Sequence, residues 1–167
     1  FYLNSQMLGS IDTTKSKNQI NMNEFINEDD MEFNIIMIHI LKGILNEYGI
    51  EINPIFKSIG NYLGEYIFFQ VYDEDIDRFL SNLSDFWQDN NLGRLSFEIK
   101  NTIRITSKNN FESMKSEKIG LPECYINVGI FEEVFSKFFK MGINVNELMC
   151  YSMGDEKCLF EIEPSWS

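Results

Sequence analysis

The sequence predicts an α+β fold in which helices pack against one antiparallel β-sheet made of two hairpins. Apolar residues recur every three or four positions over residues 31–90, which is typical of helices, and alternate with polar residues over 95–105, which is typical of strands. A further helical segment and a second strand pair follow. The 167 residues are enough to bury one core. We expect a single domain over residues 31–167, preceded by a polar arm over residues 1–30.

Three helices are expected before the first hairpin. The first follows the apolar repeat over residues 31–48, and the third runs from about residue 74 to 90. The second begins at Asn53-Pro54, because a capping residue followed by proline is typical of a helix start. Gly60 and Gly64 lie four residues apart on this second helix, so they would share one face. Their missing side chains would allow another helix or a ligand to approach closely.

The first hairpin is predicted over residues 95–105. A turn at Lys100-Asn101-Thr102 would place Ile99 opposite Ile103, and Phe97 opposite Ile105.

A polar loop over residues 107–121 leads to the fourth helix, which begins at Pro122-Glu123 and ends at Gly142. The second hairpin would pair residues 145–153 with residues 157–163 and turn at Gly154-Asp155.

The charge balance excludes several classes of function. Lys and Arg number 14 against 26 Asp and Glu, which gives a formal net charge of −12. Nucleic acids and anionic membranes both attract positive surfaces, so neither is an expected partner. The longest apolar run, residues 35–41, is far shorter than the roughly 20 residues that cross a bilayer. The first residues do not have the pattern of a secretory signal, so we expect a cytoplasmic protein.

The three cysteines point to a metal site. Cys150 and Cys158 are equidistant from Gly154, so a hairpin that turns there makes them cross-strand neighbours. Cys124 would lie in the first turn of the fourth helix, where free amide groups favour a thiolate. Together with Glu147, these thiols form a donor set that suits tetrahedral zinc. Two alternatives stay open, namely ordinary buried cysteines and a disulfide between Cys150 and Cys158.

The position of Glu147 requires an irregular strand. It precedes Cys150 by three residues, and an odd separation in a regular strand places two side chains on opposite faces. Glu147 can join the cysteines only if the strand begins after it or contains a β-bulge.

The C-terminal part of the chain resembles the 4-vinyl reductase domain family. The resemblance rests on Gly120-Leu-Pro-Glu-Cys124, the helix that follows, Glu147-x-x-Cys150 and Met153-Gly154-Asp155-x-x-Cys158-x-Phe160-x-Ile162. It covers residues 35–163, is most specific from residue 120 onward, and is strongest to the small stand-alone hydrocarbon-binding proteins of archaea and bacteria. It implies a fold like that of NO-signalling ligand-binding domains and of phenol-responsive transcriptional activators.

The resemblance also implies a ligand set. The phenol sensors hold zinc with three cysteines and a glutamate whose spacing agrees with Cys124, Glu147, Cys150 and Cys158. Four protein ligands leave no position for a reactive water, so such a zinc would be structural.

The resemblance further implies a cavity between the helices and the sheet for a small apolar or aromatic ligand. By this analogy Ile103, Val128, Val134 and Val145 would line it, although each is equally compatible with ordinary core packing. The phenol sensors fix the phenol hydroxyl with a His and a Trp. Ile103 takes the place of the Trp here, and no residue matches the His, so an apolar ligand is favoured over phenol.

Three hypotheses about function follow. The first is a non-enzymatic domain that binds or senses a small hydrophobic ligand, contains a structural zinc, and forms a homodimer as is common in the family. The second is an auxiliary factor in tetrapyrrole reduction, with a pigment-sized pocket and a partner enzyme. The third is an interaction module like the trafficking-complex subunits of the same fold, which would expose an apolar surface. A catalytic zinc is least favoured, because a water would have to replace Glu147.

Overall fold

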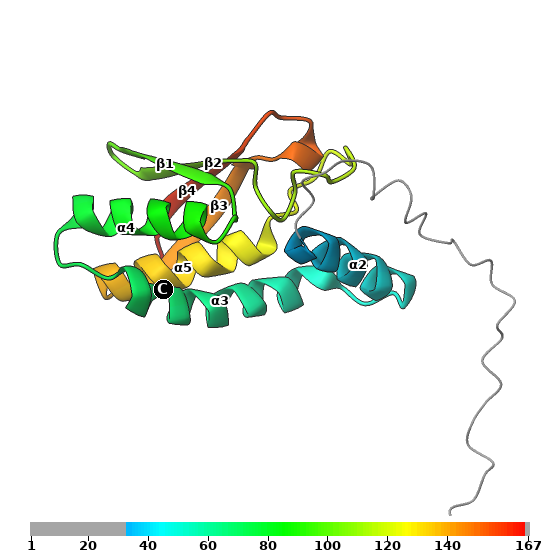
Figure 1. Cartoon of the computed structure of the whole chain (residues 1–167), viewed down its shortest axis with the longest axis horizontal. Coiled ribbons are helices and arrows are strands. Elements are labelled where there is room, and N and C mark those ends of the chain that lie inside the picture. Colours follow the sequence, from blue (N-terminus) through cyan, green and yellow to red (C-terminus); the bar gives the residue numbers. More distant parts are fainter. Residues whose placement is uncertain (1–32, 166–167) are drawn as a thin grey trace, which may run out of the picture.

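The structure is a computed structural model that describes residues 33–165. The polar arm expected over residues 1–30 lies outside the described residues. The elements are α2 (Phe33–Glu47), α3 (Ile52–Val71), α4 (Ile76–Asp89), β1 (Arg94–Ile99), β2 (Ile103–Lys108), α5 (Tyr125–Phe139), β3 (Ile143–Met149), the short 3₁₀ helix η1 (Tyr151–Met153) and β4 (Cys158–Pro164). Three helices, a hairpin, a helix and a hairpin therefore follow one another as predicted (Figure 1). This is an α+β fold.

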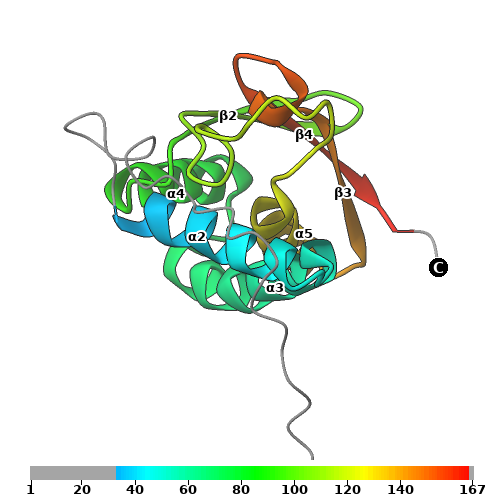
Figure 2. The same ribbon diagram turned by 90° about the vertical axis from the view of Figure 1, so that its right-hand side faces the viewer.

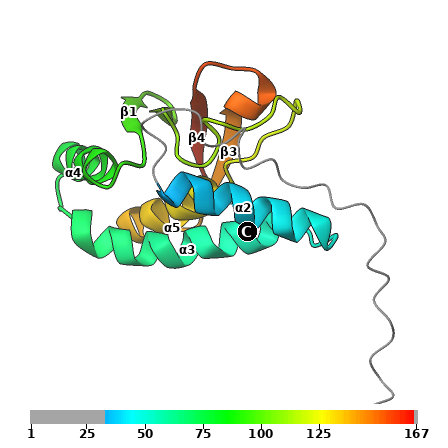
Figure 3. The same cartoon turned by 45° about the vertical axis from the view of Figure 1, so that its right-hand side comes forward.

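The four strands form one antiparallel sheet in the order β1-β2-β4-β3. The first hairpin has the predicted register, with Ile99 opposite Ile103 and Phe97 opposite Ile105. The second hairpin joins the first through its last strand, because β2 pairs with β4. The sheet covers one side of α5, and α3 covers another (Figures 2 and 3).

Helix α5 packs closely against α3 because glycines lie at the contact. A Cβ atom added to Gly60 would lie 2.2 Å from the carbonyl oxygen of Ile126, and one added to Gly129 would lie 2.2 Å from that of Lys57. The close approach predicted for Gly60 and Gly64 is therefore to a helix and not to a ligand.

An aromatic core connects the helices to the sheet. Trp87 of α4 stacks on Phe131 of α5 with ring centroids 5.3 Å apart, and Phe131 packs edge-on against Phe160 of β4 at 5.2 Å. All three side chains are fully buried. This part of the space between helices and sheet is thus filled by side chains of the protein.

The helix starts differ from the prediction by a few residues. Helix α3 begins at Ile52 with Glu51 at its N-cap, so the start expected at Asn53-Pro54 is wrong by one or two residues. Helix α4 is capped by Asp75, whose carboxylate accepts a hydrogen bond from the amide of Arg78. Among residues 33–165, no helix combines the length and the apolar character needed to cross a membrane.

Candidate metal centre

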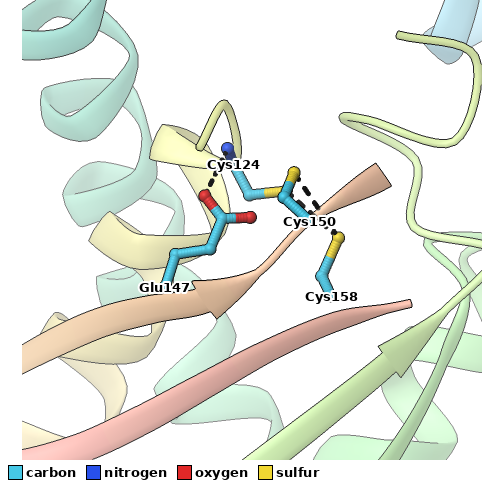
Figure 4. Close-up of side chains that lie close together, drawn as sticks. All are labelled: Cys124, Glu147, Cys150 and Cys158. Carbon is cyan, nitrogen blue, oxygen red and sulfur yellow. Dashed lines mark hydrogen bonds between the residues drawn. The ribbon is translucent and has the colours of Figure 1, made fainter. Parts of the chain in front are cut away.

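The four predicted ligand residues meet where the start of α5 reaches the β3–β4 hairpin (Figure 4). Cys124 is the N-cap residue of α5, Glu147 lies in β3, Cys150 directly follows β3, and Cys158 is the first residue of β4. Their donor atoms all lie within 4.8 Å of one another, so this cluster could hold a metal ion.

The three sulfur atoms form a triangle of the size that a tetrahedral metal site requires. Sγ of Cys124 lies 3.4 Å from Sγ of Cys158 and 3.6 Å from Sγ of Cys150, and the third side measures 3.9 Å. In a tetrahedron with metal–sulfur bonds of about 2.3 Å, the sulfur atoms are about 3.8 Å apart. All three cysteines are unpaired and fully buried.

A β-bulge brings Glu147 to the sulfurs. In the β3–β4 ladder Glu147 is opposite Phe160 and Met149 is opposite Leu159, so one extra residue lies in β3 between these pairs. The extra residue reverses the alternation of side chains, which allows Glu147 and Cys150 to face the same side. The bulge anticipated from the sequence is present. The expected strand 145–153 is nevertheless too long, because β3 ends at Met149 and the chain continues into η1.

The carboxylate of Glu147 has one occupied and one free oxygen. Oε2 accepts a hydrogen bond from the backbone nitrogen of Cys124 at 3.0 Å. Oε1 is buried and has no hydrogen-bond partner among the described residues, and it is drawn on the side of Cys150 in Figure 4. Burial, reinforced by the negative charge of Cys150, raises the pKa of Glu147 to about 8. A bound cation would satisfy Oε1 and stabilise the charged carboxylate.

The thiols oppose one another as anions. Hydrogen bonds from Cys124 and Cys158 lower the pKa of Cys150, whereas burial raises the pKa of Cys124 well above its usual range. The hydrogen bond from Cys124 lowers the pKa of Cys158, but the hydrogen bond from Cys150 and burial outweigh it and raise the value to about 12. Only one of the four groups is thus readily charged, and a divalent cation is what would stabilise all four as anions.

The amide groups at the start of α5 bind carboxylates, which corrects one expectation. Ile126 and Asn127 donate their backbone N–H groups to the carboxylate of Glu112, at 2.9 and 3.0 Å. The amide of Cys124 binds Glu147. The sequence predicts that free helix amides favour a Cys124 thiolate, but these donors are already occupied and burial dominates.

Sequence reasoning missed the residues that surround the cluster. Asn110, Glu112 and Ser113 are fully buried although they lie in the segment predicted as a polar loop. Oγ of Ser113 lies 3.1 Å from the sulfurs of both Cys124 and Cys158. Their burial could not be recognised, because an irregular segment has no periodicity that separates buried from exposed positions.

The four residues predicted to line a ligand cavity are in two different settings. Val128, Val134 and Val145 are buried in the core. Ile103 of β2 lines an open apolar groove of about 230 Å³ at one end of the sheet, together with Phe139, Met141, Ile143 and Ile162. Ile103 and Val145 are both cross-strand neighbours of Ile162, so these three residues form one row across β2, β4 and β3.

Comparison with known sequences identifies the region around the cluster. The family model of the 4-vinyl reductase domain matches residues 103–164, a range that contains all four donor residues. A curated relative, an uncharacterized protein of Methanocaldococcus jannaschii, is 29% identical over 85 residues, and the match covers 50% of this chain. It covers 45% of the relative, so the similarity spans about half of that protein.

Solved structures share the fold. The phenol-responsive sensory domain of the transcription activator PoxR, solved with phenol, has a TM-score of 0.63 at 16% identity over 81% of this chain and 76% of that one. A vinyl-4-reductase family protein from Methanocaldococcus jannaschii has a TM-score of 0.51 at 19% identity, covering 87% and 88%. An H-NOX protein from S. oneidensis has a TM-score of 0.54 at 15% identity, covering 77% and 74%. The matched domain, the four-residue cluster within it and the shared fold agree, and the chain belongs to the 4-vinyl reductase domain family.

Proposed function

We propose that this protein is a non-catalytic domain that binds a small hydrophobic ligand and contains a structural zinc ion held by Cys124, Glu147, Cys150 and Cys158. The observation that carries the zinc assignment is the sulfur triangle of 3.4–3.9 Å with the unpartnered Oε1 of Glu147 beside it. Three thiolates and one carboxylate suit zinc, and four protein donors close its coordination sphere. A structural role is therefore favoured over a catalytic one.

The zinc would connect two parts of the fold. Cys124 holds the start of α5, while Cys150 and Cys158 hold the end of the β3–β4 hairpin. Because α5 also packs between α3 and the sheet, fixing its start fixes the position of both layers. Reduced thiols that bind metal are typical of reducing compartments, which supports a cytoplasmic location.

The apolar groove beside Ile103 supports a small ligand. Its volume of about 230 Å³ lies below the range of roughly 300–1,000 Å³ that is usual for drug-sized ligands. A buried apolar cavity of about 150 Å³ is known to hold one benzene molecule. A single-ring or short aliphatic ligand therefore fits the groove, whereas a tetrapyrrole would extend well beyond it. The groove lining is mainly aliphatic, which favours an apolar molecule over phenol.

The zinc assignment is tested by metal analysis of the purified full chain. We expect one zinc ion per chain for the wild-type protein and for Leu159→Ala, a control on the neighbouring residue of β4. Cys158→Ala should lose zinc, since it removes one sulfur of the triangle. Full zinc content in Cys158→Ala, or no zinc in the wild type, would refute the assignment.

The ligand assignment is tested by titration with toluene, followed by ligand-induced shifts in NMR spectra. We expect shifts at Ile103, Ile143 and Ile162 that saturate, and their loss in Ile103→Gln, which places an amide in the groove. Ile99→Gln changes a half-exposed residue of the same hairpin outside the groove lining and should bind normally. Non-saturating shifts, or equal binding by both variants, would contradict binding at the groove. Mass spectrometry of organic extracts would then identify any co-purified molecule.

A second candidate, a protein-interaction role, is favoured by the outer sides of α2 and α3. On α2 the exposed residues Met37, Leu41, Ile44 and Tyr48 recur every three or four positions. On α3 Tyr62, Tyr66 and Phe69 are 79%, 61% and 69% exposed. Exposed apolar stripes of this kind mark interaction surfaces. We propose that a second copy of the chain covers this surface in a homodimer.

The dimer is tested by measuring mass in solution with light scattering. Tyr66→Lys, in the middle of the α3 stripe, should shift a dimer to the monomer. Ile119→Lys changes a half-exposed apolar residue outside both helices and should leave the mass unchanged. A wild-type monomer, or a Tyr66→Lys dimer, would contradict this surface as the interface.

A further inference from the structure

The segment between β2 and α5 provides a hydroxyl group directly beside the cluster. Ser113 is fully buried, and its Oγ lies 3.1 Å from Sγ of Cys124 and 3.1 Å from Sγ of Cys158. Both of the hydrogen bonds described for this hydroxyl are thus to sulfur. A thiolate that binds a metal can only accept a hydrogen bond, so in the metal-bound protein the hydroxyl would donate its proton to sulfur.

The segment holds Ser113 rigidly through its neighbours. The side-chain oxygen of Asn110 accepts a hydrogen bond from the backbone nitrogen of Glu112 at 2.9 Å, and the Asn110 amide donates to Ser107 at 3.0 Å. The Glu112 carboxylate is fixed in turn by the amides of Ile126 and Asn127. The position of Ser113 relative to the start of α5 is therefore set on both sides of the residue.

A second hydroxyl near the cluster differs in its bonding. Oγ of Ser152 lies 3.0 Å from Sγ of Cys150, but it also lies 2.7 Å from the carbonyl oxygen of Leu121. Ser152 has one proton, and the shorter contact to a stronger acceptor takes it. Ser113 has no such competing contact among those described, which makes its hydroxyl the effective donor to the sulfurs.

We propose that Ser113 is a positioning residue of the metal centre, whose hydroxyl stabilises the thiolates of Cys124 and Cys158 in the metal-bound form. The inference rests on the proposed metal-binding function. Three thiolates and a carboxylate around a divalent cation leave a net double negative charge in a buried site, and such charge is costly unless hydrogen bonds disperse it. Loss of an outer partner of this kind typically lowers metal affinity by about 10- to 100-fold.

The test compares Ser113→Ala with Ser116→Ala in the full chain. Ser116 lies in the same segment, and its hydroxyl is buried without a hydrogen-bond partner among the described residues, so it controls for loss of a hydroxyl as such. Zinc affinity is measured by competition with a chromophoric chelator, and the cobalt-substituted proteins are compared by absorption. We expect Ser113→Ala to bind zinc about 10- to 100-fold more weakly. Its sulfur-to-cobalt charge-transfer band should move to lower energy, while Ser116→Ala matches the wild type.

A pair of nearly isosteric variants separates the hydroxyl from the volume of the side chain. Ser113→Thr retains the hydroxyl and Ser113→Val lacks it, so both carry the same packing strain. We expect the charge-transfer band of Ser113→Thr to match the wild type and that of Ser113→Val to shift, a comparison that holds even if Ser113→Ala does not fold. Wild-type binding with equal affinity and band energy in every variant would overturn this inference and leave the metal site intact. A wild type that binds neither zinc nor cobalt would refute the proposed function, and the inference with it.

Discussion

The backbone nitrogen of Cys124 lies 3.0 Å from Oε2 of Glu147, so two members of the cluster, 23 positions apart in the sequence, are hydrogen-bonded to each other. This bond orients the carboxylate and leaves Oε1 buried and unpartnered among the described residues. One oxygen therefore has a structural role, and the other is available to a cation.

Glu147→Gln should separate these two roles. The glutamine oxygen can still accept the hydrogen bond from Cys124, but its NH₂ group cannot bind a cation. We expect the domain to fold and its zinc affinity to fall by more than the roughly 10- to 100-fold caused by losing an outer-shell partner. Chelator competition measures this, with the exposed Glu156→Gln in the following loop as the control. Equal affinities in the two variants would show that Glu147 does not bind the metal.

Local patterns predicted much of the fold. The alternation on either side of Lys100-Asn101-Thr102 predicted the register in which Ile99 is opposite Ile103. The spacing of Cys150 and Cys158 about Gly154 predicted that they would be neighbours, and their sulfurs are 3.9 Å apart. Both predictions succeed because a hairpin converts sequence distance directly into spatial distance.

Tertiary contacts determine what the sequence pattern missed. The pattern predicts the start of α3 at Asn53-Pro54, but the helix begins at Ile52 without a side-chain cap. Glu112 and Ser113 fall in a predicted polar loop, yet both are buried because the start of α5 and the cluster sulfurs provide their partners. Such partners come from distant segments, and no spacing within one segment reveals them.

The contact between α3 and α5 should tolerate no side chain at its glycines. An added Cβ at Gly60 or Gly129 would meet a backbone carbonyl oxygen at 2.2 Å, so the helices would have to separate. We expect Gly60→Ala and Gly129→Ala each to lower the free energy of unfolding by at least about 1–3 kcal/mol. Urea denaturation measures the effect.

A matched glycine and a double variant complete this comparison. Gly142→Ala should cost little, because its Cβ would meet a surface serine side chain, Ser165, at 3.2 Å. The double variant of Gly60 and Gly129 should cost less than the sum of the single variants, since one helix displacement relieves both clashes. Strict additivity would contradict a shared contact.

Lys42 should attach α2 to the rest of the domain. Its side chain is buried, and Nζ donates hydrogen bonds to the carbonyl oxygens of Glu112 at 3.2 Å and Glu123 at 3.3 Å. Lys42→Met keeps the apolar stem but leaves these carbonyls without their donor, at a cost of about 1–3 kcal/mol. We expect faster hydrogen exchange in α2 and unchanged exchange in α4.

The control for this prediction is Lys57→Met on α3, because Lys57 pairs with Glu132 through a half-exposed side chain. Such a pair contributes only about 0–1 kcal/mol. Unchanged exchange of α2 in Lys42→Met would show that apolar packing alone holds this helix.

Glu112 should make stability depend on pH. Burial raises its pKa from 4.5 to about 7, against the opposing effects of Lys42 and of the amides of Ile126 and Asn127. Between these two values the folded protein holds a proton on Glu112 that the unfolded chain releases. Stability from this group is therefore fully present below pH 4.5 and is lost as the pH rises to about 7, by on the order of 3 kcal/mol. Denaturation of wild type and Glu112→Gln across this range tests it, because their difference removes the titration of Glu147 and the cysteines. The wild type should lose stability relative to Glu112→Gln with rising pH, whereas the exposed Glu117→Gln should parallel the wild type; a constant difference between wild type and Glu112→Gln would mean that Glu112 stays charged in the folded protein throughout.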